Sequence, residues 1–361
     1  MDVRSRSARR VVDPDGLARV VRHLLRSSGF AAQDSATATD VLLRADLRGF
    51  ETHGVSNMLR KYLGWVEAGH IDPSAHLRLL RRAPATAGFD SQGGLGVVHA
   101  PQAMNAAIDM ARDVGIGMTT VINGRHCGMA SYHSLLAAEE GMIGVTMTAG
   151  GPRMVPTGAR GPRLGTNPIA VAAPLGTLPP FSYDASTTVS SLNRVHTARR
   201  RGLPVPGGLA ADAEGAPITV PTTDPQVDGS RLLPLGGTEE LGSYKGSGLG
   251  AIVELLSAIL GGSRPLLELG TGHNTHAFLA VRVDAFVDPA AYAEAADAFG
   301  RSFLDAEARP EATVRYPGWR AARCEQERRA AGIPLDDGVV RWLQDEYRAR
   351  SGDDVSLAPS L

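Results

Sequence analysis

The chain has 361 residues, 43% of them hydrophobic and 21% charged, so it can bury one large core or two moderate ones. Its formal net charge of −1 leaves no basic excess for the phosphates of a nucleic acid, which disfavours the nucleic-acid-binding classes. The cysteines Cys127 and Cys324 are too few for a disulfide framework and lack metal-ligand spacing, which is typical of a reducing compartment.

No part of the sequence is typical of a segment for export or membrane insertion. The basic start of the chain has no apolar run after it. No stretch approaches the roughly 18 apolar residues of a membrane span. We therefore expect a cytoplasmic protein that binds neither membranes nor nucleic acid.

The first elements expected along the chain are two helices. Asp13 followed by Pro14 is typical of an N-cap with proline at the first helical position, and apolar residues follow at helical spacing until Gly29. A second helix is predicted over about 33–47, before Gly49.

The middle of the chain mixes strands and helices. β-Rich runs occupy 115–123, 142–150 and 277–284, and helices are expected near 101–114, 129–140 and 245–261. Between Pro174 and Gly237 the sequence is rich in Gly, Pro, Thr and Asp, which predicts long loops. Such loops often carry functional residues.

The last part of the chain returns to helix, with helices expected over 289–307, 319–332 and 336–347 and a disordered tail over 351–361. We therefore predict an α/β (α+β) protein with a helical lobe from both termini and an α/β lobe between them. The expected parts are 1–78 and 287–361 for the helical lobe and 79–286 for the central lobe.

Common cofactor and metal motifs are missing from the sequence. The glycine-rich run at 246–250 lacks the last glycine of the dinucleotide fingerprint and follows a loop where that motif requires a strand. The ten histidines include no H-E-x-x-H pattern, and His273 and His276 lack a carboxylate at ligand spacing. We expect no metal site and interpret both histidines as polar loop residues or structural hydrogen-bond partners.

Short segments with chemically useful residues occur in a characteristic order. They are ADLRGFETHGV at 45–55, NGRHCG at 123–128, LGTNP at 164–168, YDASTT at 183–188, PLGG at 234–237 and YKG at 244–246. Together they resemble the malate/L-lactate dehydrogenase-like family, which includes ureidoglycolate, sulfolactate and 2,3-diketo-L-gulonate enzymes and cyclic imino acid reductases. The resemblance runs from about residue 45 to about residue 335.

The resemblance implies an NAD(P)-dependent oxidoreductase with a non-Rossmann, two-lobed fold whose central lobe is a mixed-sheet cofactor-binding lobe. It also implies a homodimer with the active cleft between the lobes. The cofactor is NAD or NADP, because the arginines at 199–201 fit either a 2′-phosphate or a solvated surface.

The family's proton donor is the histidine of its Ser/Thr-His-Gly motif, which is His53 in this sequence. A histidine suits this task because its ordinary pKa, about 6.5, is close to working pH. The relay partners correspond to Thr52 and Asp184, and a carboxylate on the far ring nitrogen would fix the tautomer. The alternative is that His53 is a loop histidine and Asp184 a turn residue.

The resemblance also implies a set of cofactor contacts, in which backbone amides and small hydroxyls in loops cradle a pyrophosphate. The candidates are His126, Cys127, Gly128, Met129, Ala130, Thr166, Asn167, Pro168, Ser186, Thr187, Thr188 and Lys245. Lys61 and Lys245 are the only lysines in an arginine-rich chain. We expect Lys245 to bind a phosphate or carboxylate, with a solvated lysine as the alternative.

The sequence departs from the family pattern at the expected substrate site. Asn57 stands four residues after His53, where the family usually has an arginine suited to a carboxylate. Arg60 follows on the same face if the segment is helical. We expect Asn57 and Arg60 to bind substrate and small acids such as pyruvate to be poor substrates.

Further departures leave the substrate and cofactor preference open. Trp319 replaces a glutamate, Asn193 and Arg194 replace a Gly-Lys pair, and Leu209 replaces a tryptophan. The leading hypothesis is a reductase or dehydrogenase of 2-oxo/2-hydroxy acids or cyclic imino acids. The alternatives are a specialised biosynthetic ketone or imine reductase and a degenerate member that binds a ligand without turnover.

Overall fold

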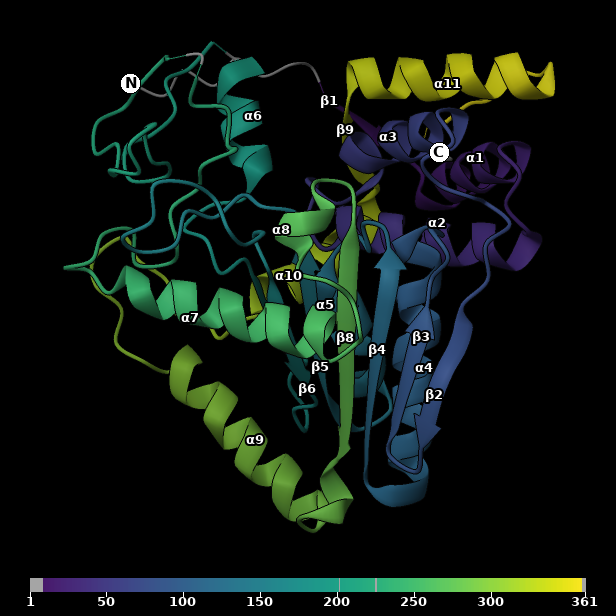
Figure 1. Ribbon diagram of the computed structural model, residues 1–361. Coiled ribbons are helices and arrows are strands. Elements are labelled where there is room, and N and C mark those ends of the chain that lie inside the picture. Colours follow the sequence, from purple (N-terminus) through teal and green to yellow (C-terminus); the bar gives the residue numbers. More distant parts are fainter. Residues whose placement is uncertain (1–8, 201, 225, 359–361) are drawn as a thin grey trace.

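The computed structural model describes residues 9–200, 202–224 and 226–358 (Figure 1). Segments from both ends of the chain form one helical lobe. Its elements are β1 (Arg9–Val12), α1 (Pro14–Ser27), α2 (Ala32–Leu47), α3 (Val55–Glu67), α10 (Trp319–Ala331), β9 (Ile333–Asp336) and α11 (Asp337–Ser351). Strands β1 and β9 pair antiparallel, and α1 packs against α11 and α2.

The helical lobe follows from local signals and one shared core. Asp13 caps α1, because its carboxylate accepts the amide hydrogen of Gly16 at 2.7 Å. The apolar stripe of α1, with Leu17 and Leu24, is buried against Leu42 of α2 and Leu343 of α11. The predicted first two helices are confirmed.

The expected disorder of the tail is wrong for residues 352–358. The side chain of Leu357 is buried in the core of the helical lobe, and its carbonyl oxygen accepts the amide hydrogen of Asp13 at 2.9 Å. Val355 also packs against this core, and its carbonyl oxygen accepts from Nε2 of Gln344 at 2.9 Å, so both residues dock this polar segment. Residues 359–361 lie outside the described residues.

The central lobe contains a seven-stranded sheet in the order β2-β3-β4-β8-β5-β6-β7. The strands are β2 (Arg78–Ala83), β3 (Thr86–Asp90), β4 (Ile116–Gly124), β5 (Met142–Gly150), β6 (Ile169–Ala173), β7 (Phe181–Ala185) and β8 (Asn274–Arg282). Only β3 and β4 run parallel, and the other neighbours are antiparallel. The predicted mixed, non-Rossmann sheet is confirmed.

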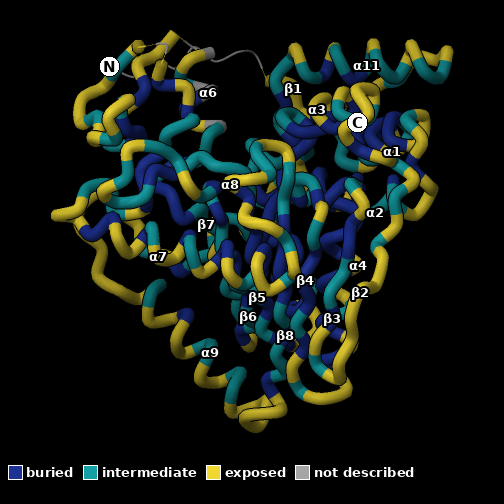
Figure 2. The backbone as a smooth tube through the Cα atoms, in the orientation of Figure 1, coloured by how far each residue is buried: buried dark blue, intermediate teal, exposed yellow. Residues whose placement is uncertain are grey.

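Helices cover both faces of this sheet. Helices α4 (Gly96–Val114) and α5 (Ala130–Glu139) pack on one face, and α7 (Ser243–Glu254) continues as the π-helical η1 (Leu255–Ile259) across the other (Figure 1). Glycine is required on the α5 side, because a Cβ atom on Gly144 would lie 2.3 Å from the Ser134 carbonyl oxygen. In Figure 2 the central strands β4 and β5 are largely buried between these layers, whereas the edge strand β2 is exposed.

The remaining elements lie mainly on the surface of the central lobe. They are α6 (Leu192–Arg200), α8 (Leu266–Leu269), the 3-10 helix η2 (Val283–Ala285) and α9 (Pro289–Leu304). Helix α9 falls within the range expected for the helical lobe but packs elsewhere, because Asp297 accepts the amide hydrogens of Thr177 and Leu178 beside the sheet. None of the described helices is long and apolar enough to cross a bilayer.

Candidate active site

The His53 loop is held at the start of α3 by a buried carboxylate. Oδ2 of Asp46, at the end of α2, accepts the amide hydrogen of Val55 at 2.7 Å. A Cβ atom on Gly54 would lie 2.1 Å from Oδ1 of Asp46, so only glycine fits between His53 and α3. Burial raises the pKa of Asp46 to about 7. Asp46 lies within the motif at 45–55, but its neighbours in the sequence do not indicate this role.

His53 itself contacts the first of its expected partners. The Oγ1 atom of Thr52 lies 2.9 Å from Nδ1 of His53. Burial lowers the pKa of His53, the negative charge of Asp184 opposes that effect, and the positive charge of Lys61 adds to it. The protonation of this ring therefore depends on two oppositely charged neighbours.

Asp184 acts on His53 through its charge. It lies on β7, and its Oδ2 atom accepts the amide hydrogen of Ser131 at 2.8 Å, at the N-terminus of α5. Burial raises the pKa of Asp184, whereas the Ser131 amide and His53 lower it. A direct hydrogen bond between Asp184 and the ring is not among the contacts of the described residues, so Ser131 positions this carboxylate.

A second imidazole lies beside His53. The rings of His53 and His126 are stacked, with centroids 5.6 Å apart and an interplanar angle of 10°. Nδ1 of His126 accepts the amide hydrogen of Gly128 at 3.2 Å and lies 2.7 Å from the hydroxyl oxygen of Tyr62. Nδ1 is therefore an acceptor, Tyr62 donates to it, and the ring hydrogen lies on Nε2. Burial lowers the pKa of His126 to about 3, so this ring is neutral.

A cavity of about 740 Å³ opens in front of the two rings, between the helical lobe and the end of β5. Its lining residues are His53, Met58, Lys61, Trp65, Gly69, His70, Ile71, Arg125, His126, Gly150, Gly151, Arg153, Thr166, Ser191, Leu192, Thr271, Gly272, His273 and Asn274. The set contains three cationic side chains, Lys61, Arg125 and Arg153, and no carboxylate. This cavity therefore suits an anionic ligand.

The structure places the expected cofactor contacts in different surroundings. His126 and Thr166 line the cavity. Asn167 is fully buried and structural, since its Nδ2 donates to the Gly250 carbonyl oxygen at 2.9 Å and its Oδ1 accepts from the Gly150 amide at 3.2 Å. The buried candidates are Cys127, Gly128, Met129, Ala130, Thr187 and Thr188, with Pro168 and Ser186 partly buried.

Lys245 and several other expected residues lie outside this cavity. Lys245 is exposed on α7, with Nζ 5.8 Å from the centre of the Tyr244 ring. Leu209 is buried in a small apolar cluster, and Trp319 starts α10 against Tyr316. Of the arginine run at 199–201, Arg201 lies outside the described residues.

The expected substrate residues also point elsewhere. Nδ2 of Asn57 donates to the Glu51 carbonyl oxygen at 2.8 Å, and Arg60 is exposed with its guanidinium 4.9 Å from the centre of the Trp342 ring. Lys61, the next residue, lines the cavity instead. The scarcity of lysine was the one signal in the sequence that singled out Lys61.

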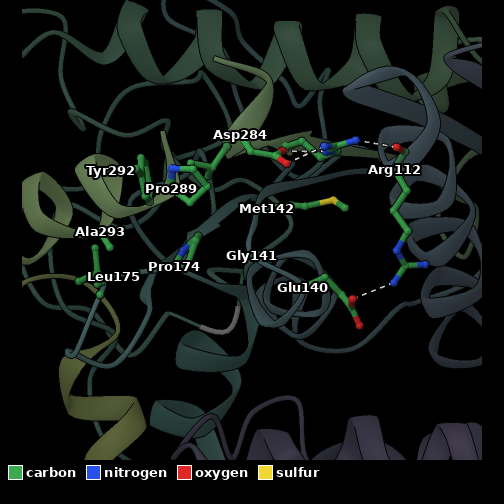
Figure 3. A pocket seen from close by; sticks show the side chains of 13 residues that line it. Arg112, Glu140, Gly141, Met142, Pro174, Leu175, Asp284, Pro289, Tyr292 and Ala293 are labelled. Atoms are coloured by element: carbon green, nitrogen blue, oxygen red, sulfur yellow. Dashed lines mark hydrogen bonds and ion pairs between the residues drawn. The ribbon is translucent and has the colours of Figure 1, made fainter. Parts of the chain in front are cut away.

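A second cavity, of about 560 Å³, lies at the opposite end of the sheet (Figure 3). It is lined by Met142, at the start of β5, whereas Gly150 at the end of β5 lines the cavity next to His53. Its arginines are paired, with Arg112 bound to Glu140 at 2.7 Å and Arg282 to Asp284 at 2.6 Å. This cavity is therefore separate from the candidate active site and offers no uncompensated charge.

Known proteins of one family match almost the whole chain. The sequence model of the malate/L-lactate dehydrogenase family matches residues 12–344. Malate dehydrogenase of Pyrococcus horikoshii is 34% identical over 92% of this chain and 94% of that protein. L-sulfolactate dehydrogenase of Methanocaldococcus jannaschii is 31% identical over 93% of this chain and 96% of that protein.

Solved structures with the same fold include malate dehydrogenases from two organisms. That of Entamoeba histolytica has a TM-score of 0.89 and 29% identity, covering 95% of this chain and 98% of that one. That of Pyrococcus horikoshii has a TM-score of 0.85 and 31% identity, covering 96% of this chain and 97% of that one.

Proposed function

The chain belongs to the malate/L-lactate dehydrogenase family of NAD(P)-dependent oxidoreductases, and we propose that it interconverts a 2-oxo acid and a 2-hydroxy acid, or the cyclic imino acid analogue, with His53 as the proton donor. The observation that carries this proposal is the placement of His53, bonded to Thr52, in a cavity lined by cations and no carboxylate. Both the substrate and the cofactor are anions that such a cavity would attract.

The residues around the cavity fit a nicotinamide dinucleotide. Its volume of about 740 Å³ lies within the roughly 300–1,000 Å³ of ligand pockets. The lining combines cations for a pyrophosphate with polar groups such as Thr166 and the Nε2–H of His126. The bound cofactor would supply or accept hydride at the substrate carbon.

We propose His126 and Thr166 as direct cofactor contacts, because both line the cavity. The other candidates at 127–130, 167–168 and 186–188 shape the neighbouring loops, and Lys245 stays a prediction. Comparison of turnover with NADH and with NADPH would decide between the two cofactors.

His53 is suited to hold and release a proton at a defined atom. Because Thr52 engages Nδ1, the Nε2 atom is left for the cavity that the ring lines. In reduction, the imidazolium would give the Nε2 proton to the substrate oxygen or nitrogen while Nδ1–H stays bonded to Thr52. In oxidation, neutral Nε2 would accept that proton. The charge of Asp184 stabilises the imidazolium in both directions.

The proposal is tested by following oxidation of NADH and NADPH with a panel of 2-oxo acids and cyclic imino acids. Turnover of any of these compounds by wild type, and its loss in His53→Ala, would support the proposed enzymatic activity. Turnover only with a bulky ketone or imine would favour a specialised reductase. Binding of cofactor without turnover of any panel member would mean a degenerate, ligand-binding member.

We also propose that the protein is a homodimer. Ile252, Leu255 and Ile259 on α7 and η1 are 47%, 56% and 43% exposed. Their spacing of three and four residues places them on one outer face of this helical segment. An exposed apolar face of this kind is typical of a surface that a partner covers.

A further inference from the structure

One face of α3 lines the cavity beside His53. Met58, Lys61 and Trp65 are spaced by three and four residues, so they share this face of the helix. Asn57 also lies one turn before Lys61, but its amide is bound to the Glu51 carbonyl oxygen. Lys61 is therefore the cation that α3 contributes to the cavity.

Among the three cations of the cavity, Lys61 is the one whose charge acts on both imidazoles. It lowers the pKa of His53 and that of His126. The guanidinium of Arg125 is held by carbonyl oxygens, with Nε donating to His70 at 3.0 Å and Nη1 to Gly124 at 3.2 Å. Lys61 is thus the cation associated with the proton donor.

The chemistry of the proposed substrate requires these two groups to be neighbours. In a 2-oxo or 2-hydroxy acid, the carboxylate is attached directly to the carbon that reacts. A residue that binds this carboxylate must therefore lie close to the group that protonates the adjacent oxygen. Met58 and Trp65, one helical turn to either side of Lys61, are the apolar residues of this face, and Lys61, itself exposed, is the cation between them.

We infer that Lys61 binds the carboxylate of the substrate and makes this site selective for 2-oxo and 2-hydroxy acids. The inference rests on the proposed function and deepens it. A bound carboxylate also neutralises the positive charge that Lys61 exerts on His53. Substrate binding therefore favours the imidazolium form of His53, the form that donates the proton in reduction.

The first test compares an acid with its uncharged ester in Lys61→Met, which keeps the length of the side chain and removes its charge. A charge-assisted hydrogen bond is worth roughly 1.5–3 kcal/mol, so kcat/KM for the best 2-oxo acid should fall about 10- to 100-fold. The value for its methyl ester should change less than about threefold, and Lys61→Arg should restore part of the preference for the acid. Equal losses for acid and ester would overturn the inference.

Arg60→Met provides the neighbouring comparison, because Arg60 lies outside the cavity on the same helix. The inference expects the acid-over-ester preference to be lost in Lys61→Met and kept in Arg60→Met. Loss of the preference in Arg60→Met alone would assign the carboxylate to Arg60 and contradict the inference. Circular dichroism and the fluorescence-measured Kd for the cofactor establish that each variant is folded and loaded.

The second test needs no turnover. An NMR titration of the His53 ring should show a higher pKa in Lys61→Met than in wild type, because a cation has been removed. At a concentration that occupies wild type and leaves Lys61→Met largely empty, oxamate, an unreactive isostere of a 2-oxo acid, should raise the pKa of His53 in wild type but not in Lys61→Met. A purely structural role for Lys61 would move neither value.

Oxamate also separates failure of the inference from failure of the proposed function. Wild type that turns over no acid, imine or ester refutes the proposed function. Oxamate affinity measured by calorimetry with cofactor present then still decides the role of Lys61. The loss of a charge-assisted hydrogen bond should weaken oxamate binding by at least about tenfold. A loss of affinity of that size in Lys61→Met supports the inference, and any smaller loss overturns it.

Discussion

The Oγ1 atom of Thr52 lies 2.9 Å from Nδ1 of His53, and this contact between neighbours in the sequence determines which ring nitrogen is available to the cavity. A hydroxyl can accept from Nδ1–H and so retain a proton there while Nε2 exchanges one. Asp184 contributes its charge from β7, and the buried Asp46 holds the loop from behind.

Replacing His53 by alanine removes the proposed proton donor. General acid catalysis is typically worth about 10²–10⁴-fold, so turnover should fall by that order while cofactor binding survives. Steady-state kinetics and a fluorescence titration of the cofactor measure the two quantities. Near-normal turnover in His53→Ala would show that the ring is structural.

Asp184→Asn should move the pH profile of reduction to lower pH. The negative charge of Asp184 raises the pKa of His53, so its removal lowers that pKa further. Because reduction needs the imidazolium, kcat/KM falls as pH rises through the pKa of His53, and this fall should occur at lower pH in the variant. Asp345→Asn, an exposed carboxylate on α11, is the matched control. A profile unchanged in Asp184→Asn would argue against the electrostatic role.

Asp46 should make the unfolding free energy depend on pH. Its pKa is raised to about 7 in the folded protein, whereas an unfolded aspartate titrates near about 4. The folded state therefore holds a proton that the unfolded state has lost, and stability from this group declines as pH rises from about 4 to about 7. Urea unfolding at several pH values should show a smaller decline in Asp46→Asn. The same slope in both proteins would contradict this.

Gly54→Ala should destabilise the protein, because the new Cβ atom would lie 2.1 Å from Oδ1 of Asp46. Overpacking of this kind costs roughly 1–3 kcal/mol. Gly64, inside the helix that Gly54 precedes, is the control for a glycine with open space, since a Cβ atom there has no neighbour within 4 Å. Gly64→Ala should stabilise by about 0.5–1 kcal/mol. Equal effects of the two substitutions on Tm would refute the proposed fit around Asp46.

Leu255→Arg should disrupt the proposed homodimer, because it places a charge on the exposed face of η1. Analytical ultracentrifugation of wild type at micromolar concentration should give a dimer and the variant a monomer. Leu80→Arg on β2, where Leu80 is 42% exposed, tests a charge on a different apolar surface and should stay dimeric. A monomeric wild type would rule out the proposed assembly.

Local signals in the sequence determined the helix starts, and the resemblance to the family identified the candidate acid. Asp13 and Pro14 set the beginning of α1, because a cap and a fixed φ act within one turn of the chain. The Thr52-His53-Gly54 segment was predicted as the site, and its residues are adjacent in the sequence. The missing dinucleotide fingerprint likewise indicated a fold other than Rossmann.

Contacts between distant segments required the tertiary structure. Strand β8 inserts between β4 and β5 although more than 120 residues separate it from each. The docking of Leu357 in the helical core and the packing of α9 beside the sheet are equally remote in sequence. The choice of Lys61 over Arg60 for the cavity depends on the rotation of α3, which its packing against the helical core decides. Helical spacing identifies which residues share a face, but only that packing determines where the face points.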